Sequence, residues 1–167
     1  TVDIRRIDRR GADRIYRVSL KFHVGANKFD VAMGPGALGR TLVDEYPEVV
    51  DATRLYAEEN FFISYEDKQF REEHVLWAES NIFNIFDIDL IAGRYESALS
   101  QPNSIIITEG MAEKYFGPSE PIGKMLSVSD GHLYTVTGVA RELPPTSHFH
   151  FDFLASYSTP NERREAG

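Results

Sequence analysis

The chain has 167 residues, of which 42% are hydrophobic and 12% aromatic, and this composition excludes an intrinsically disordered protein. Its formal net charge of −8 and the lack of a basic stripe argue against a nucleic-acid partner. The sequence has no cysteine, which excludes disulfides and thiolate chemistry, and no apolar run approaches the roughly 20 residues of a transmembrane helix. We therefore expect one domain, or two small lobes, with a core of normal size.

The first third of the chain predicts a strand, a helix and a second strand. Residues 3–14 are charged and arginine-rich, and indicate a short helix or connector. Residues 15–24 alternate apolar and polar side chains, as in a half-buried strand. After a Gly-Pro-Gly break at 34–36, a helix is expected from about 37 to 46 with Leu38, Leu42 and Val43 facing inward. Residues 49–56 are expected to form the second strand.

The middle of the chain predicts a β-hairpin followed by a short helix. Residues 61–65 and 69–77 resemble paired strands around a polar turn at 66–68. The acidic pairs Glu58–Glu59 and Glu72–Glu73 are interpreted as solvated charge. Ser80 is positioned to cap a helix, and an apolar stripe on that helix is expected to pack into the core. Its members are Ile82, Phe83, Ile85 and Phe86. Residues 87–93 are then expected to be extended, and 96–102 to form a polar loop.

The stretch from 102 to 139 is the best-defined unit of the sequence. Residues 104–107 predict a strand buried on both faces, and 108–116 a helix capped by the Thr108 side chain and ended by Gly117 and Pro118. The segments that end at 128 and begin at 133 predict a hairpin. The loop from 117 to 124 superficially resembles a phosphate-binding loop, but its glycine spacing is wrong and Met125 follows the lysine, so no cofactor is expected there.

One group near the C-terminus is a candidate metal site. If residues 148–155 form a strand, His148, His150 and Asp152 share one face, opposite a row of phenylalanines. Two imidazoles and a carboxylate are plausible metal ligands. The favoured interpretation is a polar outer face over a Phe-lined core, because no third or fourth ligand is identifiable elsewhere. No reaction class emerges from the sequence, so we expect a protein that is not an enzyme and holds no metal or cofactor.

Several segments, in order along most of the chain, resemble the periplasmic core domain of MacB-like ABC transporter permeases, in particular the branch common in Bacteroidetes-type bacteria. The segments are A-D-R-I-Y-R-V at 12–18, E-Y-P-E-V at 45–49, N-I-F-N-I-F-D-I-D-L-I-A-G-R at 81–94, A-L-S-Q-P-N-S-I-I-I-T-E-G-M-A-E-K-Y-F-G at 98–117, P-I-G-K at 121–124, Y-T-V-T-G-V at 134–139 and L-P-P-T-S-H-F-H-F-D-F at 143–153.

The resemblance implies an α+β fold with a mixed βαβ porter-like lobe and a second, inserted β-rich lobe. Residues 1–14 would be a connector from a membrane helix, 15–60 and 134–156 the porter-like lobe, 61–133 the inserted lobe, and 157–167 a polar tail. The family usually carries more structure after the F-D-F-L-A-S stretch, so the porter-like lobe is expected to be incomplete here.

The resemblance also implies a place and a set of partners. The domain would lie on the periplasmic side of a protein of the inner membrane and would transmit motion driven by a cytoplasmic ABC ATPase. A second permease copy, and in some systems a periplasmic adaptor protein, would be its other partners.

Two alternatives remain open from the residues themselves. One is a periplasmic ligand-binding or sensor module, which a ligand-sized apolar cleft would favour. The other is a metal-dependent enzyme that uses His148 and His150, which a third ligand brought near them would favour.

Overall fold

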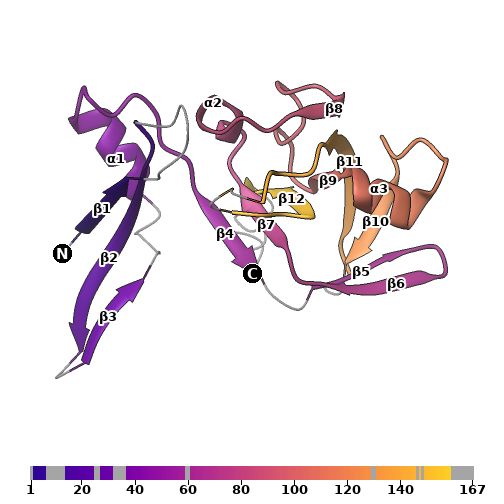
Figure 1. The fold of residues 1–167 in the computed structure, drawn as a ribbon, viewed down its shortest axis with the longest axis horizontal. Coiled ribbons are helices and arrows are strands. Elements are labelled where there is room, and N and C mark those ends of the chain that lie inside the picture. The colour runs from indigo at the N-terminus through magenta and orange to yellow at the C-terminus, as the bar shows by residue number, and fades with distance from the viewer. Residues whose placement is uncertain are drawn as a thin grey trace. The chain divides into compact units, whose positions relative to one another are not determined.

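The computed structural model describes residues 2–6, 14–24, 27–31, 37–58, 61–128, 131–145, 147 and 149–158, with the backbone alone for 2–6, 19–24, 27–31 and 58. The chain divides into two compact units, Thr1–Ala52 and Thr53–Gly167. Figure 1 labels the helices and strands of both units. No helix among these residues combines the length and apolar character needed to cross a bilayer.

In the first unit, the described residues form a three-stranded antiparallel sheet with a helix after it. Its strands are β1 (Val2–Arg6), β2 (Tyr16–Val24) and β3 (Asn27–Val31), in the order β1-β2-β3, and its helix is α1 (Leu38–Glu45). Strand β2 and helix α1 confirm the sequence-based predictions. The helix or connector expected over 3–14 is wrong at its start, because β1 pairs with β2 from Val2 opposite Leu20 to Arg6 opposite Tyr16.

Helix α1 presents its apolar side as the sequence predicts, although it buries none of its residues fully. Leu38, Leu42 and Val43 are half-buried, while Arg40, Thr41 and the residues that follow Val43 in the helix are exposed. The Gly-Pro-Gly break at 34–36 lies outside the described residues.

The described residues of the second unit form a nine-stranded sheet and two helices, which Figure 1 labels. Eight strands follow the order β4-β7-β12-β9-β11-β10-β5-β6, and β8 pairs with β11 beside that path. The strands are β4 (Leu55–Glu58), β5 (Phe61–Tyr65), β6 (Lys68–Glu72), β7 (Val75–Ala78), β8 (Leu90–Gly93), β9 (Ser104–Thr108), β10 (Met125–Val128), β11 (Leu133–Ala140) and β12 (Phe153–Ser156), and the helices are α2 (Ile82–Ile85) and α3 (Glu109–Phe116).

The centre of this sheet is buried on both faces. Every residue of β7, β9 and β12 is buried, as predicted for the isoleucine run at 104–107. Ile105 and Ile107 join the core cluster that also contains Tyr115 and Phe116 of α3. Ile106 points to the opposite face because strand side chains alternate, and Gly138 of β11 lies close enough beside it that an added Cβ would be 3.2 Å from Ile106 Cγ1.

The predicted strand–helix–hairpin unit is confirmed, except for the helix cap expected from Thr108. Strand β9, helix α3 and the antiparallel pair β10–β11 confirm the predictions for 104–139. The Thr108 side chain makes no capping hydrogen bond, and its Oγ1 is buried without a partner. The Glu142 carboxylate accepts instead from the backbone N–H of Gly110, at 3.2 Å, in the first turn of α3. At the other end Gly117 has φ +56°, a conformation that favours glycine.

Three predicted elements have other boundaries. Residues 49–54 are not a strand, and β4 begins only at Leu55. The single strand expected over 69–77 is two strands, β6 and β7, on different sides of the sheet order, so only the β5–β6 part of that hairpin is confirmed. The strand expected over 148–155 is the short β12, preceded by irregular backbone at 149–152.

The architecture is a mixed α+β fold with mostly strands and few helices, as predicted. The stripe on α2 is also partly in the core, since Ile82 and Phe86 are buried while Phe83 and Ile85 are half-buried. The lobe boundaries expected at 15–60, 61–133 and 134–156, the connector and the tail stay predictions.

Candidate functional site

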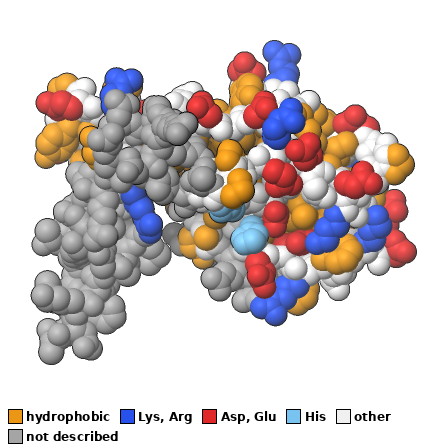
Figure 2. All heavy atoms as spheres, in the orientation of Figure 1, with side chains coloured by type: hydrophobic (Ala, Val, Ile, Leu, Met, Phe, Trp, Pro, Cys, Tyr) orange, Lys and Arg blue, Asp and Glu red, His pale blue; other side chains and the backbone are white. Residues whose placement is uncertain are grey.

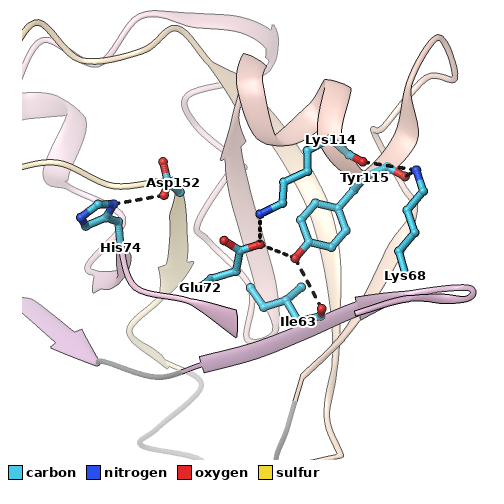
Figure 3. A network of polar contacts seen from close by, with 7 residues as sticks. All are labelled: Ile63, Lys68, Glu72, His74, Lys114, Tyr115 and Asp152. Atoms are coloured by element: carbon cyan, nitrogen blue, oxygen red, sulfur yellow. Dashed lines mark hydrogen bonds and ion pairs between the residues drawn. The ribbon is translucent and has the colours of Figure 1, made fainter. Parts of the chain in front are cut away.

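One face of strand β6 holds the last turn of helix α3 (Figure 3). Lys68, Phe70 and Glu72 lie on this face because strand side chains alternate. The Lys68 Nζ donates to the backbone carbonyls of Lys114, at 3.2 Å, and Tyr115, at 2.9 Å. The Phe70 ring meets the Tyr115 ring edge-on, with centroids 5.5 Å apart, and the Lys114 Nζ lies 4.4 Å from the Phe70 centroid. We call these five residues the α3 clamp.

A buried carboxylate is the centre of the α3 clamp. Glu72 is 5% exposed, and its Oε1 accepts hydrogen bonds from the Tyr115 hydroxyl at 2.5 Å and the Lys114 Nζ at 2.8 Å. A buried carboxylate is costly unless it is paired and hydrogen-bonded, and both conditions are met here. Burial, followed by the hydrogen bond to Glu72 and the charge of Glu72, raises the pKa of Tyr115 well above its ordinary value. The phenol therefore stays protonated and donates.

The polar groups of the α3 clamp form a structural contact between β6 and α3. The phenol is held in its protonated form, and the carboxylate accepts from both neighbours, so the three groups stabilise one another. Lys68 adds a positive charge at the C-terminal end of α3, where the helix dipole favours a cation. Five residues from two elements far apart in the sequence thereby fix the hairpin to the helix.

The sequence-based interpretation of Glu72 as solvated charge is wrong, whereas its neighbour Glu73 is exposed. The signal available was the alternation in K-Q-F-R-E, which places a lysine, an aromatic ring and a glutamate on one strand face. The partners lie 42 and 43 residues away in the sequence, and local pattern reasoning does not find them.

The last residue of α3, Phe116, makes a second aromatic contact next to the α3 clamp. The Tyr65 and Phe116 rings meet at a centroid distance of 4.6 Å. The Lys124 Nζ lies 5.4 Å from the Tyr65 centroid and 5.3 Å from the Phe116 centroid, a cation–π arrangement. The lysine that superficially resembled a phosphate ligand therefore packs against two rings.

The candidate metal ligands do not form the strand face that was predicted. Asp152 precedes β12, and its Oδ2 lies 3.2 Å from the Nδ1 of His74, a residue that the sequence did not single out. His150 is exposed, and His148 lies outside the described residues. Within the part of the chain that the structure describes, no three His, Cys, Asp or Glu side chains are grouped to hold a metal ion.

An open hollow lies beside α2. It measures about 280 Å³ and is lined by Phe83, Asn84, Phe86, Asp87, Ile88 and Tyr95. Small-molecule sites are usually enclosed and measure roughly 300–1,000 Å³. This hollow is therefore a weak basis for a ligand-binding function.

The surface of the second unit carries charges of both signs. Figure 2 shows acidic and basic side chains interspersed over the face in view. The Arg141 Nε lies 2.9 Å from the Asp89 Oδ2, and an Arg54 guanidinium nitrogen lies 2.6 Å from the Glu79 Oε1. Such surface ion pairs contribute little to stability, and nothing about them indicates a binding site.

Residues 3–166 match the family described as the MacB-like periplasmic core domain. A search of curated proteins gives no match.

Several solved structures are similar to this chain, among them the following two. The first is a domain assigned to a permease protein of Porphyromonas gingivalis, with 29% sequence identity and a TM-score of 0.69, covering 79% of this chain and 56% of that one. The second is the periplasmic region of MacB from Actinobacillus actinomycetemcomitans, with 16% identity and a TM-score of 0.54, covering 69% of this chain and 51% of that one. At that identity the second likeness concerns the fold alone. The chain thus spans about half the length of each solved domain.

Proposed function

This chain belongs to the MacB-like periplasmic core domain family, and from that premise we propose that it is the periplasmic domain of an ABC transporter permease in the inner membrane. The observation that carries the proposal is the family match over residues 3–166. The similarity to the Porphyromonas gingivalis permease domain supports it.

The activity that we propose is mechanical. A cytoplasmic ATPase hydrolyses ATP, and the resulting movement of the permease is passed through this domain to the periplasmic side, for efflux or another transport process. A second permease copy is a partner in this scheme, and a periplasmic adaptor is a further candidate. The α3 clamp supports the mechanical role because it ties the outer strand β6 to the helix that packs on the core.

The geometry of the second unit suits a body that moves as a whole. Its central strands are buried along their full length, so the sheet resists bending. Its outer strand β6 is exposed except at Glu72, but the α3 clamp ties it to the helix that packs on the same core. A movement applied to one side of the unit is therefore transmitted to its other side, because little of it is absorbed by local bending.

The experiment compares ATP-driven movement in three forms of the full-length permease, reconstituted with its ATPase in lipid nanodiscs. Spin labels are placed at Met125→Cys, an exposed β10 position, in wild type, Glu72→Ala and Glu73→Ala backgrounds. We expect the label-to-label distance between two permease copies to change on ATP addition in wild type and in Glu73→Ala. In Glu72→Ala the change should be smaller or broader, while ATP hydrolysis continues.

A label that shows the same distance distribution with and without ATP in wild type contradicts the mechanical proposal. Equal responses in Glu72→Ala and Glu73→Ala, with ATP-driven movement intact, remove the α3 clamp from the mechanism. Glu73 is a matched control because it is the same residue type on the neighbouring, exposed position.

A further inference from the structure

Strand β6 is the last strand on its side of the sheet. It pairs with β5 along its whole length, from Lys68 opposite Tyr65 to Glu72 opposite Phe61, and no other described strand lies on its outer side (Figure 1). An outer strand offers unpaired backbone N–H and C=O groups to another strand. The edge of β6 is therefore a candidate interaction surface.

The charged side chains that could guard the edge of β6 contact helix α3 instead. Proteins often guard edge strands with lysines, with charges that would be buried by a partner strand, with proline or with bulges. The Lys68 ammonium is bound to two carbonyls of α3, and the Glu72 carboxylate is already buried and paired. Strand β6 contains no proline, and its register with β5 is unbroken. A partner strand would meet no unpaired charge from either residue.

The α3 clamp also fixes the conformation of this edge. Residues 68, 70 and 72 all contact the last turn of α3, so β6 is held extended from its first to its last residue. Binding to an edge that is already ordered loses less conformational entropy than binding to a frayed one. The edge is thus preorganised for strand addition.

We propose that β6 pairs antiparallel with β6 of a second copy of this chain, in the register that places Phe70 opposite Phe70 of the partner subunit. The reason is the self-complementary sequence K-Q-F-R-E at 68–72. In this register each Lys68 faces a Glu72, each Gln69 faces an Arg71, and the two phenylalanines meet at the two-fold axis. Because Lys68 and Glu72 are already bound to α3, their opposition only avoids like charges, and the favourable cross-strand contact is the aromatic pair. An isologous contact of this kind closes after two copies.

Neighbouring registers fit less well. Centring the pair on Arg71 places two arginines opposite each other, and centring it on Gln69 places Lys68 opposite Phe70, so both registers lose the aromatic pair. In the favoured register, Asp67 faces Glu73 just outside the strands. That repulsion, together with the turn at 66–67, limits the contact to five residues, and the association is accordingly weak and dependent on concentration.

The test uses cysteine crosslinking of the 167-residue chain, which has no cysteine of its own. Opposite residues of an antiparallel pair have Cα atoms about 4.5–5.5 Å apart, within the range that a disulfide spans. Under oxidised glutathione at high protein concentration, we expect Phe70→Cys to form disulfide-linked dimers at least about tenfold faster than Met125→Cys, an exposed control outside the edge. Equal rates mean random collision and overturn the proposal.

A second pair of variants keeps the test decisive if Phe70→Cys weakens the fold. Gln69 and Arg71 point away from α3, so cysteines there leave the α3 clamp intact. When the Gln69→Cys and Arg71→Cys chains are mixed in equal amounts, we expect the 69–71 disulfide to exceed the half share that random pairing gives. A random share, or an excess of 69–69 or 71–71 products, contradicts the register. The assay needs neither membrane nor ATP, so its failure leaves the transport proposal untouched.

Discussion

The central strands and the outer hairpin of the second unit are held in different ways. Strands β9 and β12 bury every residue, and most of their side chains are apolar. Strand β6 buries only Glu72, and it is held through hydrogen bonds, an ion pair and ring contacts with one turn of α3.

The difference shows that apolar burial holds the centre of the sheet, whereas specific polar and aromatic contacts hold its edge. Apolar burial stabilises the centre in proportion to the area removed from water, and it is insensitive to the identity of any single partner. The α3 clamp depends on particular atoms, since removing one partner leaves another buried polar group unsatisfied. The centre gives the unit its stability, and the clamp gives its edge a fixed place.

The largest expected effect is in the centre. Ile106→Ala removes a fully buried side chain between β11 and β12 and should lower the free energy of unfolding by about 2–5 kcal/mol. Urea unfolding followed by tryptophan fluorescence measures it. Phe62→Ala, at a position that is 44% exposed on β5, is the control and should cost about 1 kcal/mol or less. Similar losses for both variants would erase the distinction between centre and edge.

The next effect is at the centre of the α3 clamp. Glu72→Ala removes the acceptor of Tyr115 and Lys114 and should lower the free energy of unfolding by about 2 kcal/mol, because hydrogen bonds to a charged group are lost together with an ion pair. The same change at Glu73, which is exposed, should stay within about 0.5 kcal/mol. Equal, small effects at both glutamates would show that the clamp does not hold the hairpin.

Tyr115→Phe should cost about 1–2 kcal/mol at neutral pH, since Glu72 loses one of its two donors. The loss should shrink in alkaline solution. The pKa of Tyr115 is raised in the folded state, so its contribution is complete below the unfolded value of about 10 and declines above it by up to about 1.4 kcal/mol per pH unit. Unfolding of both proteins at pH 8, 10 and 11 measures this. A difference in free energy of unfolding between wild type and Tyr115→Phe that stays constant with pH contradicts the raised pKa of Tyr115.

The smallest effect is at the start of β6. Lys68→Met keeps the side-chain length but removes the donor to the last carbonyls of α3, and should cost about 0.5–1 kcal/mol. Hydrogen exchange of the α3 amides near Tyr115 is the sharper measurement, and it should become faster. Gln69→Met, which faces the other side of β6, is the control. If exchange in α3 is unchanged, Lys68 does not hold the helix end.

Local sequence patterns predicted the parts that are governed by local physics. The isoleucine strand β9, the strand β2 and the strand–helix–hairpin unit were predicted correctly because burial and periodicity leave a direct imprint on the sequence. Strand β1 was missed because its charged residues resemble a connector, and only pairing with β2 makes it a strand. The strand expected over 148–155 was too long because residues 149–152 have irregular backbone before β12 begins.

The candidate site was the least predictable part. Glu72 becomes a buried residue only because α3 places Lys114 and Tyr115 against it, and their contact is set by the sheet order β10-β5-β6. Asp152 pairs with His74 for a similar reason, since β7 and β12 are neighbours in the sheet although 78 residues separate the two side chains. Contacts of this range depend on topology, which periodicity does not encode.

The most direct test of the proposed function is the side of the membrane on which this domain lies. We would place a single cysteine at Met125, which is 56% exposed, in the full-length protein without other cysteines, and treat intact cells with an impermeant thiol reagent after permeabilising the outer membrane. The periplasmic assignment predicts labelling from outside that equals labelling after lysis. Protection in intact cells together with full labelling after lysis would place the domain in the cytoplasm and contradict the permease proposal.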